Sequence, residues 1–203
     1  MKLALFAFAA SLAVSNPASA AQSNAEKPAA QQHGAPQQAP PDPFAGVPAA
    51  KPDDVKSVNS ILAALYDVIS GPAGERDWNR FRSLFMPNAR LTSAEKSPDG
   101  AVHVRPSSVE DYVRLGGNYF LKNGFFEKPI VSRVQIFGNV AQVFSSYESR
   151  HAPGEAPFAR GINSFQLAFD GKRWWVVNIL WDEERPDNPL PKEFASNPKA
   201  PSS

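Results

Sequence analysis

Three stretches decide the fold: residues 134–151 (VQIFGNVAQVFSSYESRH), 159–169 (ARGINSFQLAF) and 172–181 (KRWWVVNILW). Each predicts a β-strand, because β-branched and aromatic residues dominate it. Turn signals separate them, His-Ala-Pro-Gly at 151–154 and Asp-Gly at 170–171. The second half of the chain is therefore expected to be an antiparallel meander.

Helical patterns precede the meander. A first helix is expected after a cap at Asp53 or Asp54 and before Gly71-Pro72. Its apolar residues recur at steps of three and four: Val55, Val58, Ile61, Leu62, Leu65, Tyr66 and Ile69. Residues 75–85 predict a second helix. A third begins at Ser107, which forms a capping box with Glu110.

Short strands at 89–93 and 101–105 are expected between the second and third helices, joined by a Ser-Pro-Asp-Gly turn at 97–100. A longer strand region from Phe125 leads into the meander. The fold class is thus α+β, with helices and an antiparallel sheet in one domain.

The last strand is apolar on both faces. Strict alternation places Trp174, Val176 and Leu180 on one face. It places the remaining apolar residues on the other: Trp175, Val177, Ile179 and Trp181. Two arrangements would cover both faces: a second subunit on the outer face, or a bent sheet that wraps one large core.

The termini predict an exported protein. Residues 1–20 have the pattern of a signal peptide, with Lys2, an apolar run at 3–14 and Ala-Ser-Ala at 18–20. A retained membrane anchor is the alternative, but the run is short for a bilayer. We expect a periplasmic or secreted protein with no membrane attachment after cleavage.

One domain is expected, at residues 53–185. Residues 21–52 are rich in Ala, Gln and Pro and predict a disordered linker. This linker serves as a spacer or carries a docking motif. The tail at 186–203 has a similar composition and is expected to be loose.

Composition excludes several functions. The chain has no cysteine, so disulfides and thiolate metal sites are excluded. The 21 Lys and Arg residues nearly balance the 20 Asp and Glu residues, without a basic run, which argues against nucleic acid and anionic membranes as partners. The three histidines form no pair with metal-ligand spacing, and we expect no metal or other cofactor.

The chain resembles the nuclear transport factor 2-like superfamily, which includes scytalone dehydratase, ketosteroid isomerase and polyketide cyclases. The resemblance is carried by the helix and strand order and by a series of residues: Ala141-x-Val143, Ser146-Tyr147-Glu148-x-Arg150, Gly161–Leu167, Gly171-x-x-Trp174 and Ile179-x-Trp181. These residues are similar to a bacterial, mostly uncharacterised branch with provisional lumazine-binding and polyketide-cyclase-like labels.

The resemblance implies a cone-shaped open barrel, in which a curved, mostly antiparallel sheet packs on about three helices. It also implies a pocket between the sheet and the long helix, and a homodimer through the outer face of the sheet. The enzymes' acid on the first strand has no counterpart at 89–93, and Ala159-Arg160-Gly161 replaces the branch's His-Cys-Gly. The catalytic residues therefore stay unknown.

Aromatic and amide side chains are the candidates for a ligand pocket: Tyr66, Trp78, Phe81, Tyr112, Tyr119, Tyr147, Asn163, Asn178 and Trp181. Glu148, Arg150 and Arg160 are candidates for the pocket mouth, with a solvated surface pair as the alternative.

The expected function is that of an exported module that binds a small, partly apolar molecule or mediates assembly. The alternative is an enzyme of the isomerase, cyclase or dehydratase type. It would use a pocket acid or base such as Tyr66, His103 or Glu148.

Overall fold

The computed structural model describes residues 42–196. The predicted signal peptide and most of the predicted linker lie outside this range. Within it, the elements run in the order α1 (Pro52–Val55), α2 (Val58–Ile69), α3 (Trp78–Arg82), β1 (Phe85–Lys96), β2 (Val102–Ser108), α4 (Val109–Phe120), β3 (Phe126–Phe137), β4 (Val140–Arg150), β5 (Ala159–Phe169), β6 (Trp174–Glu183) and α5 (Lys192–Ala195).

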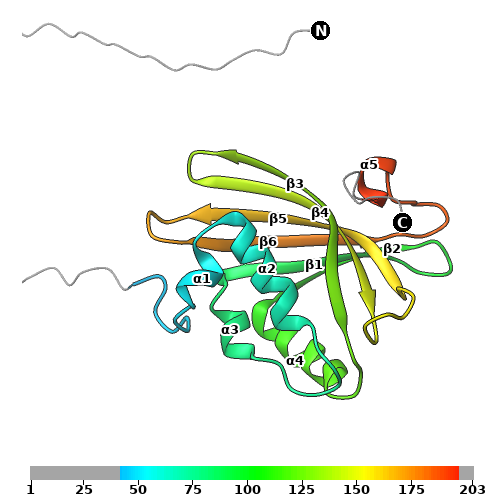
Figure 1. Ribbon diagram of the computed structural model, residues 1–203, viewed down its shortest axis with the longest axis horizontal. Coiled ribbons are helices and arrows are strands. Elements are labelled where there is room, and N and C mark those ends of the chain that lie inside the picture. The colour runs from blue at the N-terminus through cyan, green and yellow to red at the C-terminus, as the bar shows by residue number, and fades with distance from the viewer. Residues whose placement is uncertain (1–41, 197–203) are drawn as a thin grey trace, which may run out of the picture. The chain divides into compact units, whose positions relative to one another are not determined.

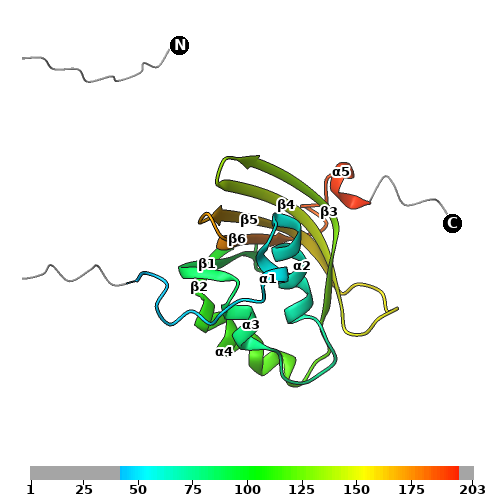
Figure 2. The same cartoon turned by 60° about the vertical axis from the view of Figure 1, so that its left-hand side comes forward.

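The strands form one curved sheet in the order β2-β1-β6-β5-β4-β3. All neighbours are antiparallel except β1 and β6, which are parallel. Helices α2, α3 and α4 lie on the same side of this sheet (Figures 1 and 2). The predicted α+β class, with a curved and mostly antiparallel sheet on about three helices, is confirmed. The sheet is open, with β2 and β3 at its edges.

The predicted first meander strand at 134–151 is wrong in its boundaries. It is divided by a tight hairpin at Gly138-Asn139, between the paired residues Phe137 and Val140. Gly138 has φ of 55°, a left-handed conformation that glycine adopts without steric cost. Two-residue hairpins favour such residues. Residues 134–137 therefore end β3, and the strand region expected from Phe125 is the rest of β3.

The prediction that side chains alternate strictly along the last strand is also wrong, because β6 contains a bulge. Gln166 pairs with Asn178, whereas the next residue, Leu167, pairs with Val176. The extra residue, Val177, shifts the alternation by one. Val176 and Ile179 consequently lie in the same buried core, while Val177 and Leu180 are exposed.

Each helix begins at a different residue from the one predicted. The first expected helix is two helices, and Ser57 caps α2 by accepting from the Ser60 amide. Asp77 caps the short α3. The capping box of α4 is formed by Ser108 and Asp111, one residue after the predicted pair.

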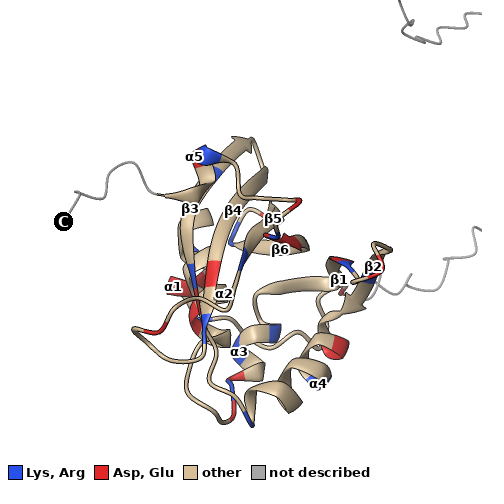
Figure 3. Cartoon of the chain, turned by 90° about the vertical axis from the view of Figure 1, so that its right-hand side faces the viewer, with Lys and Arg blue, Asp and Glu red and all other residues tan. Residues whose placement is uncertain are grey.

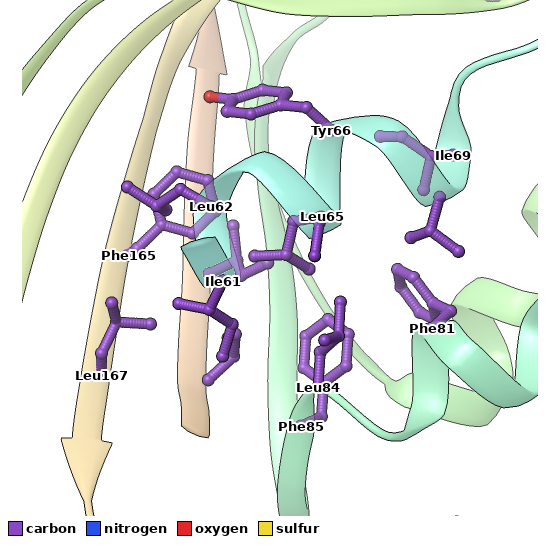
Figure 4. Close-up of a cluster of buried hydrophobic side chains, with 14 of the residues drawn as sticks. Ile61, Leu62, Leu65, Tyr66, Ile69, Phe81, Leu84, Phe85, Phe165 and Leu167 are labelled. Carbon is purple, nitrogen blue, oxygen red and sulfur yellow. The ribbon is translucent and has the colours of Figure 1, made fainter. Parts of the chain in front are cut away.

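Helix α2 lies against the concave side of the sheet and forms the centre of the core. Figure 4 shows that Ile61, Leu62 and Leu65 lie between side chains of β5 on one side and side chains of residues 81–85 on the other. Phe165 and Leu167 come from β5, and Phe81, Leu84 and Phe85 come from the segment of α3 and β1. All of these side chains are buried, so burial of this face supplies much of the hydrophobic stabilisation.

Parts of both predicted flexible segments pack on the domain. Phe44, within the predicted linker, stacks on Trp175 with ring centroids 4.7 Å apart. The Arg173 guanidinium lies 3.6 Å from the Trp175 ring, and Asp170 accepts from the indole Nε1 at 2.7 Å. In the predicted loose tail, Phe194 of α5 is buried against Phe144. The last part of the predicted linker, around Phe44, and the part of the predicted tail around Phe194 therefore pack against the domain.

Basic residues (Lys and Arg) and acidic residues (Asp and Glu) are interspersed along the helices and strands (Figure 3). No helix within residues 42–196 has the length and apolar character that a membrane span requires.

Substituting Ile61→Ala tests the central role of α2. Ile61 is 0% exposed, and large-to-small changes at such sites cost about 2–5 kcal/mol. We expect a loss of this size in the free energy of unfolding, measured by urea denaturation. The control Leu115→Ala, at a helical site that is 57% exposed, should change it by about 0.5 kcal/mol or less. Equal losses in the two variants would contradict the packing described.

Candidate functional site

A cavity of about 230 Å³ lies between the helices and the concave face of the sheet. Helices α2, α3 and α4 and strands β1 and β3–β6 all contribute to its wall. Nearly half of the residues in this wall are aromatic: Tyr66, Phe81, Tyr112, Phe125, Tyr147, Phe158, Phe165 and Trp181. The polar side chains in the wall are Glu127, Ser149, Asn163 and Glu183. The cavity is thus an apolar chamber with a few polar groups, the usual composition of a small-molecule site.

Glu127 is the polar residue most closely held by the fold. It is the second residue of β3 and lies two residues after Phe125. Phe125 forms a β-bridge with Gly71, which ties the end of α2 to the sheet. The Glu127 amide donates to Ser70 Oγ at 3.0 Å, and this hydroxyl donates to the Tyr66 carbonyl at 2.6 Å. The backbone of Glu127 is therefore fixed to the last turn of α2.

The Glu127 carboxylate accepts hydrogen bonds from two strands. Ser149 Oγ donates to Oε2 at 2.9 Å, and Asn163 Nδ2 donates to Oε1 at 3.4 Å. Asn163 also lies 3.4 Å from the Tyr66 hydroxyl, which is 3.0 Å from Ser145 Oγ. A line of polar groups thus crosses the otherwise apolar interior and ends at the carboxylate.

Burial dominates the protonation of Glu127. Removal from water raises the pKa of the Glu127 carboxyl from 4.5 to about 7, although the hydrogen bonds from Ser149 and Asn163 act in the opposite direction. The charge of Glu183 adds to the increase. Glu127 keeps some accessible surface, since it faces the cavity. A carboxyl that is part neutral and part ionised at neutral pH is suited to proton transfer.

The tyrosines around the cavity stay protonated. Burial is the main cause that raises the pKa of Tyr66, Tyr112 and Tyr147, and the charge of Glu127 adds to it in each case. Their hydroxyls are therefore available as hydrogen-bond donors throughout the physiological range.

The structure brings six of the nine predicted ligand residues to the cavity: Tyr66, Phe81, Tyr112, Tyr147, Asn163 and Trp181. Trp78 instead stacks on Phe120 with ring centroids 5.9 Å apart. Tyr119 is 39% exposed on α4. Asn178 pairs with Gln166, whose neighbours Phe165 and Leu167 face the core, so both amides lie on the outer side.

The predicted mouth residues do not line the cavity. Tyr147 and Ser149 face it, so Glu148 and Arg150 point to the opposite face of β4. There they form an ion pair with a 2.5 Å separation, and Lys128 lies 3.1 Å from Glu148. Arg160 is the strand partner of Glu148 but pairs with Glu184 at 3.1 Å. The Glu148 and Arg150 side chains are only 15% and 19% exposed, so the pair lies outside the cavity but is less solvated than the surface pair given as the alternative.

Glu127, Ser149 and Glu183 line the cavity but are not among the site residues predicted from the sequence. The available signal was an acid that directly follows Phe125-Phe126 at the start of a strand. Among the other candidates for acid–base chemistry, His103 contacts Ser97 near the β1–β2 turn and does not line the cavity.

The described part of the chain holds no cluster of three acidic or histidine side chains suited to a metal ion.

Solved structures of similar architecture include a nuclear transport factor 2-like protein of unknown function from Silicibacter pomeroyi DSS-3. It is 12% identical, covers 64% of this chain and 94% of its own, and gives a TM-score of 0.45. A candidate ketosteroid isomerase from Parabacteroides distasonis is 12% identical over 64% of this chain and 91% of its own, with a TM-score of 0.45.

A candidate dehydratase of the nuclear transport factor 2-like family from Streptomyces avermitilis is 12% identical. It covers 66% of this chain and 99% of its own, with a TM-score of 0.49. The order of helices and strands in this chain is the one that the resemblance to the nuclear transport factor 2-like superfamily predicts. Identities this low concern the fold alone. No protein-family model and no curated protein matches the sequence, and the bacterial branch stays a prediction.

The raised pKa of Glu127 predicts that stability falls at high pH. The folded state favours the neutral acid, so its stabilising contribution is complete below the ordinary value of 4.5 and is lost as pH rises through about 7. One pKa unit is worth about 1.4 kcal/mol, which gives a loss of about 2–3 kcal/mol between pH 5 and 9.

Urea unfolding at pH 5, 7 and 9 measures this loss. The Glu127→Gln variant should lack it, whereas Glu155→Gln, on an exposed loop, should keep it. Parallel pH profiles for the wild type and Glu127→Gln would contradict the assignment.

Proposed function

We propose that the protein binds a small, partly apolar molecule in the cavity and exchanges a proton with it through Glu127. The observation that carries this proposal is the position of Glu127, the carboxyl that faces an aromatic chamber and has a pKa of about 7. The proposed function is thus acid–base chemistry of the isomerase, cyclase or dehydratase type, which was the alternative to binding alone.

The geometry supports the separate parts of this chemistry. Glu127 as carboxylate accepts a proton from the bound molecule and, once neutral, returns it to another atom of that molecule. The Tyr147 hydroxyl is available to donate to an oxygen of the molecule that gains negative charge. The apolar wall excludes water and thereby strengthens both interactions.

Ser149 and Asn163 are positioning residues in this proposal. They hold the carboxylate from β4 and β5, so its direction does not depend on a flexible side chain alone. The rigid strands on both sides keep the proton-transferring oxygen within reach of one region of the cavity.

The outer face of the sheet favours a second role, in assembly. Phe137 is 87% exposed and Val140 is 57% exposed, and Phe144, Val177 and Leu180 are exposed as well. Exposed apolar groups on one sheet face are typical of protein interfaces. We therefore propose a homodimer through this face, and an exported protein because of the N-terminal pattern at residues 1–20.

A thermal-shift panel of small aromatic and alicyclic ketones, alcohols and amines tests ligand binding. Compounds that occupy the cavity should raise the melting temperature by stabilising the folded state. For a ketone that binds, deuterium uptake from D₂O at its acidic carbon reports proton transfer. Glu127→Gln should slow this uptake by about 10²–10⁴-fold while binding persists.

The variant Glu155→Gln serves as the control for this experiment, since it removes a carboxylate on an exposed loop. A panel without any stabilising compound would remove the binding proposal. Uptake in Glu127→Gln at the wild-type rate would remove the catalytic part alone.

Sedimentation velocity at micromolar concentration tests the dimer. Phe137→Lys should shift the equilibrium towards monomer, because a charge would then have to be desolvated in the interface. Val102→Lys, at a site on the edge strand β2 that is 64% exposed, should leave the dimer intact. A wild-type protein that is monomeric at this concentration would contradict the dimer.

A further inference from the structure

The charge of the cavity wall has one sign. Glu127 and Glu183 are its ionisable acids, and its lining contains no Lys, Arg or His. Basic side chains near this end of the sheet have other partners. Arg160 pairs with Glu184, and Arg185 lies 2.6 Å from Asp182 and 3.2 Å from Asp187. An anionic ligand would therefore meet two carboxyls and no compensating cation.

The aromatic wall has the complementary preference. Eight rings line the cavity: Tyr66, Phe81, Tyr112, Phe125, Tyr147, Phe158, Phe165 and Trp181. The face of each ring carries partial negative charge and attracts a cation within about 6 Å of its centroid. Aromatic enclosures are used to bind quaternary ammonium groups, which cost less to remove from water than strongly hydrated cations.

The Tyr147 hydroxyl adds a polar group to the same wall. Tyr147 is 4% exposed and lines the cavity. A tyrosine hydroxyl can accept a hydrogen bond from the N–H of a protonated amine as well as donate one.

We propose that the occupant is a small organic cation, a protonated or quaternary amine with an apolar body, whose charge is met by the carboxyls of Glu127 and Glu183. This proposal rests on the proposed function, because it names the class of molecule that the same cavity binds. The cavity, at about 230 Å³, is smaller than the roughly 300–1,000 Å³ of typical drug-sized sites. The cation is therefore small, with a body about the size of one ring.

Binding of a cation should depend on pH through Glu127. The titratable groups that face Glu127 are Tyr66 from α2, Tyr112 from α4, Tyr147 from β4 and Glu183 from β6. The tyrosines remain neutral in this range, and Glu183 adds a second negative charge. A bound cation stabilises the ionised form of Glu127, so binding releases a proton and tightens as pH rises. The ionised form is also the one that accepts a proton in catalysis.

Phenyltrimethylammonium and its neutral isostere tert-butylbenzene form the test pair, with benzenesulfonate as the anion. Dissociation constants are measured by ligand-observed NMR on the protein produced from the full chain, at pH 5.5 and 8. We expect the cation to bind at least about tenfold more tightly than the isostere at pH 8, and the anion not to bind. The preference for the cation should shrink at pH 5.5, while the affinity of the isostere stays constant.

Three variants assign the effect to the two carboxyls. Glu127→Gln should lower the cation affinity about tenfold or more at pH 8 and remove its pH dependence, with the isostere unaffected. Glu183→Gln should weaken the cation as well and keep the pH dependence. Glu184→Gln, the neighbour that pairs with Arg160 outside the cavity, should leave the cation affinity unchanged.

The outcomes separate this inference from the proposed function. Equal affinities of the wild type for the cation and the isostere, or tighter binding of the anion, overturn the cation proposal and leave small-molecule binding intact. Failure of all three probes to bind overturns the cation proposal, whereas the proposed function falls only if the panel of ketones, alcohols and amines also gives no stabilising compound. A loss in Glu184→Gln as large as in Glu183→Gln overturns the cation proposal too, since it would show a general effect of surface charge.

Discussion

The contact between α2 and the concave face of the sheet is the constraint on which the remaining structure depends. The apolar face of α2 occupies most of the space inside the curve, with Ile61 and Leu65 packed towards β5 and α3. At the end of α2 this filling stops, because Ser70 and Gly71 turn the chain towards β3. The cavity is the space left between the last turn of α2 and the strands. The same turn fixes the backbone of Glu127, so the core and the site share one set of contacts.

The buried polar groups around Glu127 lower the stability of the folded protein, and the hydrophobic core offsets this loss. A carboxyl in an apolar chamber destabilises the folded protein whenever it is ionised. The hydrogen bonds from Ser149 and Asn163 reduce that cost without removing it. Such a group persists in a fold only when the surrounding packing is strong, and functional sites are the common place for it. The buried face of α2, together with Phe81 and Phe85, supplies that packing.

The periodic parts of the chain could be predicted from sequence, and the irregular parts could not. The spacing of Ile61, Leu65 and Ile69 predicts the helix α2 and its end, though not its start, because a helical stripe is a repeated signal. The hairpin turn at Gly138-Asn139 has only two residues and lies inside an apolar stretch, so no repeated pattern marks it. The bulge at Val177 carries no signal at all in β6, because either register leaves apolar residues on both faces.

The site was predictable to the same degree. Tyr66 lies on the apolar helix face that periodicity identifies, so it could be named as a candidate ligand residue. Glu127 stands in a strand whose later residues are mostly exposed, and a strand pattern of this kind suggests a solvated acid. Its burial results from the turn after α2 and from the approach of β4 and β5, which are contacts between segments distant in sequence.

The C-terminal segment has a consequence for symmetry. Ser146 Oγ donates to the Phe194 carbonyl at 2.7 Å, and Arg160 donates to the Ala195 carbonyl at 3.1 Å, so α5 is anchored across part of the outer surface of β4 and β5. The free part of that surface lies towards the β3–β4 hairpin, around Phe137 and Val140. A two-fold axis that relates two copies would therefore pass off-centre, near the hairpin, unless the segment is first displaced. In the proposed homodimer, α5 would therefore limit where the two outer sheet faces can meet.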